Sequence, residues 1–588
     1  MSTKLKVYLN EDDALLFWSI PKPISQCRGF AIERRIKRKG KKQTEEEFLV
    51  NRTGFENEKV DAKPKAGQKA VIKPSSEWPF QRFSWTDHDA NTGDTVSYRV
   101  VPVIRNAQGD LELLESDASG WSPKKTLAPP EGKFKPFFNR GFVMSQFMAR
   151  YLAEKNLSLK DFKAQIRDKN SEVGAKHEKN IRLFLSGDLR AALLDELRTA
   201  LDEGGEIFAA LFELSDDELI DALCKLKGRA NVVLSNGSVK ANKGESSADA
   251  RLRDENEDAR RRLLEHGVDV KVEKENRFIS PGALGHNKFL VRTDKKGKPV
   301  TAWTGSLNWA PTGLCTQVNN GLLIEDPEVA RVYLDQWHEL RKAASTFPKP
   351  FVASNSKPKL VGEDSVGQVR SVVWFTRTTK GVDLDALREE VEKAREGILF
   401  LMFMPGATGL FSNVAARSGE PNLYVRGVAS ELPNGRGDES TVDATLIDGA
   451  NHTPLHLDII QPEGVKHPFA SFAEEVTRKQ FLGGIGHAII HSKIVVIDPF
   501  SADPVVITGS HNFSSTASSK NDENFIIIKG DHELAEAYAV NIFGAYSHYR
   551  WRAFLSQTNK PFNGLVDSDK WQAPRLASAR RDLRFWGV

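Results

Sequence analysis

The chain has 588 residues, which is too many for one hydrophobic core, so two to four domains are expected. Its composition, 40% hydrophobic and 28% charged, is ordinary for a globular protein. The balance of 83 basic to 79 acidic residues gives a net charge of only +4. A net charge this small gives no reason to expect nucleic-acid binding from the charge of the whole protein, although a local basic cleft remains an alternative.

The three cysteines, Cys27, Cys224 and Cys315, lie far apart and form no CxxC pair. They predict neither a disulfide framework nor a zinc site, and we expect buried thiols, no metal and no cofactor. The N-terminal stretch MSTKLKVYLNEDDALLFWSI carries acidic residues where a signal peptide needs an apolar core. The apolar run ILFLMFM (398–404) is far shorter than the roughly 18 residues of a membrane span. We therefore expect a cytoplasmic protein, or one exported without an N-terminal signal.

Residues 1–125 show short apolar or alternating runs, such as ALLFWSIP and FAIERRIKR, separated by turn signals. This pattern predicts an all-β sandwich. Trp18, the segment WTDHDANTGDTVSYRV and the later GWSP resemble a fibronectin type III domain. The resemblance implies that Trp18 is the buried core aromatic and that Tyr98 is the corner tyrosine. Two roles stay open for this domain: recognition of a protein or glycan partner, and a rigid spacer.

After this domain the pattern changes. The Pro-, Gly- and Lys-rich segment SPKKTLAPPEGKFKP (122–136) predicts a linker over 126–139. Strands and amphipathic helices then alternate through 140–350, from GEIFAALFEL and SDDELIDALCKLKG to HNKFLVRT and VTAWTGS, which indicates an α/β layer structure. The series recurs over 351–553, from DALREEVEKAREG and ILFLMFMP to HSKIVVID and VVITGS. We expect a C-terminal tail after it, at 554–588.

The second series contains an insertion at about 431–470 that is rich in Gly, Asp and Pro. A long loop of this kind near a site is more often functional than decorative. Its RGD triplet (436–438) consists of common loop residues, so we do not interpret it as an adhesion motif.

A repeat links the two series. HNKFLVRTD (286–294) is followed by GSLN, and HSKIVVID (491–498) is followed by GSHN. The stretches 305–324 and 509–528 align without a gap over 20 positions, and six of those positions are identical. Such self-similarity indicates a duplication, whose two copies are expected to face each other across a pseudo-twofold axis.

The repeated side chains suit one reaction class. Residues i and i+2 of a strand share a face, so each histidine should project together with the lysine two positions later. Two imidazoles, two ammonium groups and two amides make a cationic, donor-rich pocket, which fits a phosphodiester better than a neutral carbonyl. The pairs are His286 with Lys288, His491 with Lys493, Ser306 with Asn308, and Ser510 with Asn512.

These motifs resemble the HxKxxxxD signature of the phospholipase D superfamily, over about residues 140–553. The resemblance implies two pseudo-symmetric α/β/α sandwich halves and a mechanism without metal. One histidine attacks phosphorus to give a phosphohistidine, and the other protonates the leaving alkoxide and then deprotonates water or an alcohol. The first copy departs from the signature, because Thr293 holds the aspartate position and Asp294 follows it. This aspartate is usually peripheral.

The copies also differ eleven residues after the GSxN asparagine, where the first has Asn319 and the second has Glu523. The family commonly places a side chain there to hold the second ring nitrogen of the histidine. We expect Glu523 behind His491, raising its pKa for general acid/base work, and Asn319 behind His286, leaving that ring neutral as the nucleophile. The tyrosyl-DNA phosphodiesterase branch shows a similar asymmetry. Ser306 and Ser510 are predicted to bind substrate.

Other residues near the motifs carry weaker signals. His487 is interpreted as structural, and His511 could face the site or the core. Wall packing is favoured over base or lipid stacking for three aromatic residues: Trp303, Trp309 and Phe513. The basic stretch RLASARRDLRFW near the C-terminus is interpreted as a solvated face, with contact to an anionic surface as the alternative.

The substrate is the least determined point, because the superfamily processes phosphodiesters in lipids and in nucleic acids with the same central residues. A phospholipid is the leading substrate, and FMPGATGLF (403–411) is a candidate lipid-facing loop. A nuclease is the first alternative, for which the basic residues of 122–136 and 573–584 could contribute. A catalytically silent scaffold that binds phosphate is the second alternative.

Overall fold

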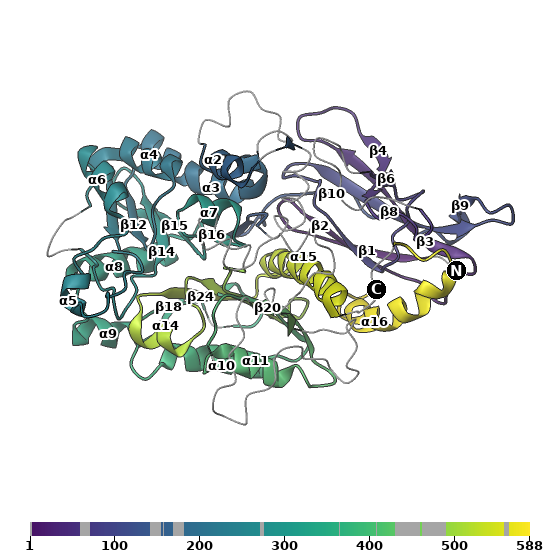
Figure 1. Ribbon diagram of the computed structural model, residues 1–588. Coiled ribbons are helices and arrows are strands. Elements are labelled where there is room, and N and C mark those ends of the chain that lie inside the picture. The colour runs from purple at the N-terminus through teal and green to yellow at the C-terminus, as the bar shows by residue number, and fades with distance from the viewer. Residues whose placement is uncertain are drawn as a thin grey trace.

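The computed structural model describes residues 3–58, 71–141, 155–156, 158–168, 181–270, 276–363, 365–406, 408–429, 459–460, 490–557 and 564–588. These residues form mixed α/β structure, with β-sheets alone at the N-terminal end and helices with sheets in the remainder (Figure 1).

The N-terminal part contains two larger antiparallel sheets and a two-stranded one formed by β5 (Val50–Asn51) and β6 (Lys73–Pro74). A three-stranded sheet has the order β1-β2-β7, and a five-stranded sheet has the order β10-β8-β3-β4 with β9 paired to β8. Trp18 is fully buried and its ring centroid lies 5.7 Å from that of Phe30. Tyr98 is also fully buried, and its hydroxyl donates to Asp87 at 2.8 Å. The strands are β1 (Lys4–Leu9), β2 (Ala14–Ser19), β3 (Cys27–Lys37), β4 (Glu45–Phe48), β7 (Ser84–Asp87), β8 (Thr95–Arg105), β9 (Leu111–Leu113) and β10 (Lys125–Thr126).

Two larger sheets follow along the chain. The first has six strands in the order β11-β16-β15-β14-β12-β13. Its strands are β11 (Phe134–Phe138), β12 (Ile207–Leu211), β13 (Ala230–Leu234), β14 (Lys288–Thr293), β15 (Pro299–Gly305) and β16 (Asn320–Ile324). The second has eight strands in the order β17-β18-β24-β23-β22-β19-β20-β21. Its strands are β17 (Lys359–Val361), β18 (Arg370–Phe375), β19 (Gly397–Met402), β20 (Tyr424–Ala429), β21 (Ile459–Ile460), β22 (Ile494–Ile497), β23 (Val505–Gly509) and β24 (Asn524–Lys529).

The two sheets share one strand pattern. In the first, β12 pairs in parallel with β13 and antiparallel with β14; in the second, β19 pairs in parallel with β20 and antiparallel with β22. The next pairings, β14-β15-β16-β11 and β22-β23-β24-β18, are antiparallel throughout. Six strands of each sheet therefore follow the same order with the same directions.

Helices separate and cover the two sheets. The outer face of the first sheet packs on α3 (Ile181–Glu203), α4 (Asp217–Leu226) and α6 (Glu257–Glu265), and the outer face of the second packs on α10 (Val382–Lys393) and α11 (Leu410–Arg417). The inner faces share one core with α8 (Pro327–Ala343) and α15 (His532–Gln557). Alternating strand residues explain this, since Leu399 and Leu401 face the inner core whereas Ile398 and Phe400 face the outer one.

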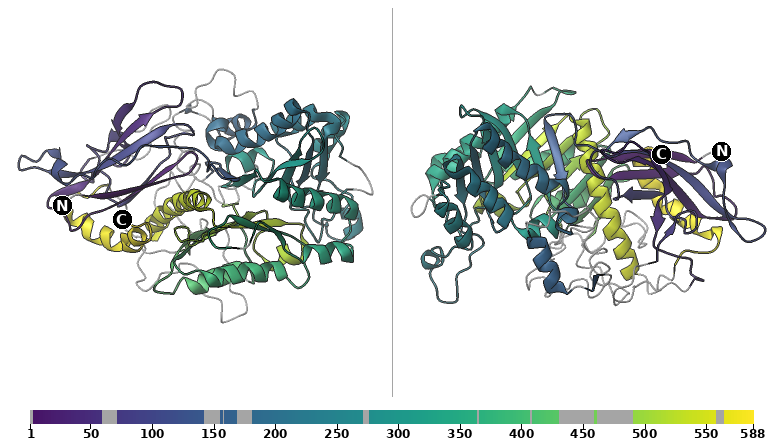
Figure 2. Two further views of the ribbon diagram at one scale, coloured as in Figure 1. Left: turned by 180° about the vertical axis from the view of Figure 1, so that it is seen from behind. Right: turned by 90° about the horizontal axis from the view of Figure 1, so that it is seen from above.

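The inner core also reaches the N-terminal sheets. Helix α15 runs from the second sheet toward the N-terminal sheets, and α16 (Gln572–Phe585) lies alongside them (Figures 1 and 2). Phe17 of β2 stacks on Trp586 with centroids 4.9 Å apart and contacts Phe543 of α15 at the same distance. The residues expected to form a C-terminal tail, 554–588, thus include a helix that packs on the N-terminal sheets.

A strand occupies the segment expected to be a linker. Within 126–139, β11 pairs antiparallel with β16 and forms the edge of the first sheet. Pro136 lies in the middle of this strand, and an edge strand tolerates proline because one side of it needs no ladder hydrogen bonds. The backbone N–H of Phe138 donates to Glu11 at 2.8 Å, so this strand also joins the first sheet to the N-terminal part.

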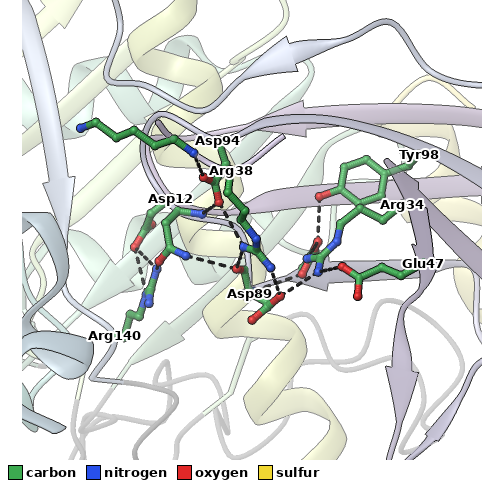
Figure 3. A network of polar contacts seen from close by, with 11 residues as sticks. Asp12, Arg34, Arg38, Glu47, Asp89, Asp94, Tyr98 and Arg140 are labelled. Atoms are coloured by element: carbon green, nitrogen blue, oxygen red, sulfur yellow. Dashed lines mark hydrogen bonds and ion pairs between the residues drawn. The ribbon is translucent and has the colours of Figure 1, made fainter. Parts of the chain in front are cut away.

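A polar network completes this junction (Figure 3). Arg140 donates from Nε to Asp12 at 3.0 Å and from a terminal nitrogen to Asn91 at 3.2 Å. Burial raises the pKa of Asp12 to about 7, although Arg140 acts in the opposite direction. On the N-terminal side, buried Arg34 pairs with Asp87 at 2.8 Å. The N-terminal part is therefore joined to the first sheet by buried charged groups as well as apolar contacts.

None of the described helices combines the length and the apolar character that crossing a membrane requires.

Candidate active site

The two repeated histidines meet where the two large sheets face each other. Gly285, directly before His286, forms an isolated parallel bridge with Asp522 of the second copy. The backbone N–H of His491 donates to the carbonyl of Val318 in the first copy at 2.9 Å. Each histidine is thus held next to the segment that follows the GSxN motif of the other copy, and both are buried.

The partners of the imidazoles are crossed between the copies. His286 Nδ1 lies 2.7 Å from a carboxylate oxygen of Glu523. His491 Nδ1 lies 2.8 Å from the amide oxygen of Asn319. The expectation that Glu523 lies behind His491 and Asn319 behind His286 is therefore wrong. The spacing of a motif does not reveal that its orienting residue serves the other copy.

Both contacts fix the tautomer of the ring. A carboxylate accepts only, so His286 donates from Nδ1 and keeps a lone pair on Nε2. The amide of Asn319 donates from its nitrogen to the carbonyl of Gly313 at 2.9 Å, which leaves its oxygen to accept from His491. Both rings thus carry their lone pair on Nε2.

The GSxN serines hold these partners. Ser306 donates to the amide oxygen of Asn319 at 2.8 Å, and Ser510 donates to the carboxylate of Glu523 at 3.0 Å. Each hydroxyl also accepts a backbone N–H from the next strand. Both serines are fully buried, and their single hydroxyl hydrogens are used by the orienting residues. These contacts differ from the expected role in substrate binding.

The lysines lie beside the histidines. Lys288 and Lys493 are buried, and each donates to the carbonyl of the histidine two residues earlier, at 2.9 and 2.5 Å. Each ammonium group retains hydrogens for an anion. The pairs precede or only begin their strands, since β14 starts at Lys288 and β22 at Ile494. The expectation that each histidine and lysine share one face of a strand is therefore only partly met, because these residues lie just before the strand or at its first position.

Two phenylalanines that the sequence analysis did not single out pack on these groups. The ring of Phe212 lies 4.8 Å from the ring of His286 and 5.0 Å from the Lys288 ammonium. The ring of Phe403 lies 4.7 Å from His491 and 4.8 Å from the Lys493 ammonium. Both residues directly follow the equivalent strands β12 and β19, so their matching positions in the two copies were a usable signal.

The two asparagines of the GSxN motifs have different surroundings. Asn308 donates to the carboxylate of Glu213 at 2.8 Å, a residue that the sequence analysis missed. Among the described residues, Asn512 has no carboxylate partner. The Oδ1 atoms of both asparagines are buried without a hydrogen-bond partner among the described residues. Such atoms are normally satisfied, so these two asparagines have hydrogen-bonding capacity left for a ligand.

Burial and like charges set the protonation of the cluster. Burial lowers the pKa of His286 to about 4, against the opposing effect of Glu523. Burial and the two lysines lower the pKa of His491 well below its usual value. Burial also lowers the pKa of Lys288 to about 7, and burial with the Lys288 charge lowers that of Lys493. At neutral pH the free site therefore has two neutral imidazoles, and Lys288 and Lys493 lose their protons more readily than exposed lysines do. A bound anion would stabilise the charged form of both lysines.

The aspartate of the signature lies away from the cluster. Asp498 accepts backbone N–H groups of Arg395, Glu396 and Gly397 at the start of β19. Thr293, at the same position of the first copy, accepts the backbone N–H of Glu206 before β12 at 3.1 Å. Both side chains fix a strand end, which explains why threonine substitutes there without loss at the site.

The other candidates fall into three groups. Trp303, Trp309 and Phe513 are buried core residues, in agreement with wall packing. His511 is fully buried and faces the core, 3.3 Å from Asp383. His487 and the insertion 431–470 with its RGD triplet (436–438) lie outside the described residues, apart from β21. Within the part of the chain that is described, no group of three or more His, Cys, Asp or Glu side chains could hold a metal ion, and the three cysteines are buried and free.

Comparison with known proteins gives matches over both motif-bearing segments. A family model described as cardiolipin synthase, PLD-like domain, matches residues 193–341 and 439–543. A phospholipase D of Rickettsia bellii is 33% identical over 105 residues, which are 18% of this chain and 49% of that protein. A phospholipase D of Rickettsia conorii is 49% identical over 53 residues, which are 9% of this chain and 24% of that protein. The matched segments thus span half or less of these relatives.

Among solved structures, the phosphatidylserine synthase of Haemophilus influenzae Rd KW20 aligns with a TM-score of 0.38 and 12% identity, over 68% of this chain and 92% of that chain. Residues 193–341 and 439–543 are thus similar to a PLD-like domain, and these two segments contain both copies of the motif.

Proposed function

We propose that the protein is a phosphodiester hydrolase or transferase that acts through a covalent phosphohistidine without a metal ion. The observation that carries this proposal is the buried cluster of two imidazoles and two ammonium groups, in which each imidazole is oriented from the opposite copy. Orienting partners of this kind fix reactive nitrogens in place before the substrate binds, and the ammonium groups neutralise a phosphoryl anion.

His286 is the nucleophile in this proposal. Its neutral ring has a lone pair on Nε2, which attacks phosphorus while the bond from phosphorus to the leaving oxygen breaks. The ring gains positive charge as the N–P bond forms, and Glu523 lies 2.7 Å from the other nitrogen to stabilise that charge. Although burial raises the pKa of Glu523, His286 and further neighbours keep it below its usual value, so the carboxylate is ionised. The sequence predicts the same nucleophile, but with Asn319 behind His286. In the structure the carboxylate of Glu523 lies there instead, so the argument for His286 is the stabilisation of its positive charge.

His491 is the general acid and base. In the free site His491 is neutral, and the bound phosphodiester anion, which offsets the charges of Lys288 and Lys493, raises its pKa so that Nε2 takes up a proton from solvent. Asn319 orients the ring without stabilising the imidazolium, so this proton is readily given up. That proton goes to the leaving alkoxide in the first step. In the second step His491 Nε2 takes a proton from water or an alcohol, whose oxygen attacks phosphorus, and the P–N electron pair returns to His286.

The remaining motif residues bind the phosphoryl group. Lys288 and Lys493 are proposed to contact its non-bridging oxygens, together with the amides of Asn308 and Asn512. Ser306 and Ser510 are positioning residues that hold Asn319 and Glu523.

Two structural proposals accompany this function. The common strand order supports a duplication whose halves are related by a pseudo-twofold axis, with one half near 140–350 and the other near 351–553. Buried Trp18 and the Tyr98–Asp87 hydrogen bond support a fibronectin type III-like fold for residues 1–125. The shared core with α15 and α16 favours a structural role of that domain over a free recognition module.

Phospholipid is the proposed substrate class, because the curated relatives are named phospholipase D and the matching family model is named for cardiolipin synthase. The test is to incubate the protein, in a chelator, with phosphatidylcholine vesicles and separately with single- and double-stranded DNA. Choline release that His286→Ala and His491→Ala abolish is the expected result. His266→Ala, an exposed histidine on α6, is the matched control.

Three outcomes would contradict parts of this proposal. DNA cleavage without choline release would replace the substrate class by nucleic acid. Activity that disappears in the chelator would contradict the metal-independent mechanism. A trapped phosphoryl adduct on His491 that still forms in His286→Ala would reverse the two histidine roles.

A further inference from the structure

The two sides of the site differ at one position. Phe212 and Phe403 pack on the two histidines at nearly the same distances, 4.8 and 4.7 Å. The residue after Phe212 is Glu213, whereas the residue after Phe403 is Met404, whose exposed fraction is 40%. The first copy therefore places a carboxylate where the second places an apolar side chain.

Glu213 is held against the GSLN loop. Its carboxylate accepts from the amide nitrogen of Asn308 at 2.8 Å, and its backbone carbonyl accepts from Trp309 N–H at 3.1 Å. The side chain is only partly buried. Asn308 is the one side chain in the described ranges that donates to this carboxylate, so its second oxygen is available to a ligand.

The charge of Glu213 works against the binding of an anion alone. Burial and Glu255 raise the pKa of Glu213 above its usual value, although Lys288, Asn308 and Lys493 act in the opposite direction, so Glu213 lies within electrostatic reach of both ammonium groups. Glu523 has a clear task in the proposed reaction, because it orients His286. Glu213 has none, and a carboxylate beside a phosphate site repels the phosphate unless another substrate group attracts it.

A second observation points to the kind of group. Asn308 is 6% exposed, its nitrogen donates to Glu213, and its Oδ1 is buried without a partner among the described residues. A free carboxylate oxygen and an unsatisfied amide oxygen therefore lie on the same side of the site. Both are acceptors, and a buried acceptor without a donor is costly, so a substrate that supplies a donor there is favoured.

We propose that Glu213 is a specificity-determining residue that accepts a hydrogen bond from an ammonium or hydroxyl group on the headgroup of a phospholipid substrate. This inference rests on the proposed function of the same site. It gives the first copy the headgroup-binding side, and it leaves the Met404 side, where Met404 takes the position of the carboxylate, for the remainder of the lipid.

The test compares two lipids that differ in headgroup donors. Phosphatidylethanolamine carries an ammonium donor, and phosphatidylmethanol with the same acyl chains carries none. The ratio of their kcat/KM values in mixed micelles is measured for the wild type, E213Q, E213M and E389Q. E213Q can still accept from Asn308 but presents a donor to the headgroup, E213M copies the second site, and E389Q removes an exposed carboxylate on α10 as the matched control.

We expect the wild type to prefer phosphatidylethanolamine, and both Glu213 variants to reduce that preference by about tenfold or more, as the loss of a charged hydrogen bond implies. E389Q should leave it unchanged. If E213Q lowers kcat/KM equally for both lipids, or changes neither value, the ratio stays the same and the inference is overturned. An equal decrease would mean that Glu213 only holds Asn308 in position. Cleavage of bis(p-nitrophenyl) phosphate is followed in parallel. If the wild type cleaves no phosphodiester at all, the proposed function itself fails.

Discussion

The carboxylate of Glu523 accepts a hydrogen bond from Nδ1 of His286 at 2.7 Å, although 237 positions of sequence separate the two residues. The contact joins the segment just before β14 in the first sheet to the segment just before β24 in the second. It also places the only carboxylate that touches either motif imidazole among the described residues behind the histidine of the first copy. The two histidines therefore differ in charge environment despite their similar motifs.

The first prediction concerns this carboxylate. E523Q keeps a hydrogen-bond partner for His286 but removes the charge that stabilises a cationic phosphohistidine. We expect kcat for a phosphodiester to fall by about 10- to 100-fold, by analogy with the loss of the carboxylate partner of a metal-ligating histidine. Rapid-quench trapping of the adduct should show slower formation. A rate within twofold of the wild type would contradict the role given to Glu523.

A charge swap tests the same relationship more sharply. The double variant N319D/E523Q moves the carboxylate from His286 to His491 while both rings keep a partner. We expect the trapped phosphoryl group to map to His491 in this variant and to His286 in the wild type. If it stays on His286 in both, the position of the carboxylate does not decide which histidine attacks.

The second prediction is a pH profile. Burial lowers the pKa of His286 to about 4, so the neutral nucleophile is present down to that pH rather than to its usual 6.5. Burial lowers the pKa of Lys288 to about 7, so the free enzyme loses this charge above neutrality. Because the proposed reaction needs neutral His286, a proton on His491 and charged Lys288, kcat/KM should be low below about pH 4 and should fall as pH rises, most steeply above about 7, where Lys288 also loses its charge. A profile that is flat up to pH 9, where ordinary lysines are still protonated, would contradict it.

Much of the site was predictable because a duplicated sequence marks it. The motif residues His286, Lys288, His491 and Lys493 all lie in one buried cluster, as their repetition indicated. The crossed partners were not predictable from spacing, since spacing compares residues within a copy. The pairing arises from tertiary bridges such as that between Gly285 and Asp522, which join segments of different copies.

The fold was predictable where periodicity is strong. The helix expected over SDDELIDALCKLKG is α4, with Asp216 as its N-cap, and the strand expected over ILFLMFMP is β19. Composition misled at β11, because Pro136 and its charged neighbours are typical of a linker, and only the edge position in the sheet makes this strand possible. Glu213 was missed because a single glutamate after an apolar strand has no pattern until Asn308 lies against it.

The third prediction concerns the junction with the N-terminal sheets. R140M removes the buried partner of Asp12 (Figure 3), and breaking such a pair costs about 3 kcal/mol. Asp12 has a folded pKa near 7, above its unfolded value of 3.8, so its contribution to stability is present at low pH and is lost as pH rises through that interval. R140M should therefore lower the free energy of unfolding more at pH 8 than at pH 6, measured by urea unfolding.

The control is R35M, whose partner Glu46 is 55% exposed. This variant should lower the free energy of unfolding by less than about 1 kcal/mol. Equal losses in both variants would contradict the role of the junction.

The last prediction concerns His511, which occupies the variable position of GSHN where the first copy has Leu307. Its Nδ1 accepts the backbone N–H of Phe513 at 2.9 Å, and its Nε2 lies 3.3 Å from Asp383. Although burial raises the pKa of Asp383, His511 and two hydroxyl donors keep it below its usual value, so His511 faces a carboxylate in the core. His511 is thus a positioning residue that fixes the loop carrying Asn512.

H511L should leave Asp383 short of a partner and cost about 1–3 kcal/mol in stability. It should also lower kcat with little change in KM, because the amide of Asn512 is no longer fixed. The double variant D383L/H511L also removes the carboxylate, so no buried charge is left unpaired and part of the stability should be recovered, although the hydroxyls of Thr378 and Ser518 lose their acceptor. It should not recover kcat, because the N–H of Phe513 still lacks its acceptor. Recovery of kcat together with stability would show that His511 matters for folding alone, and a phosphoryl adduct on His511 would contradict its place in the core.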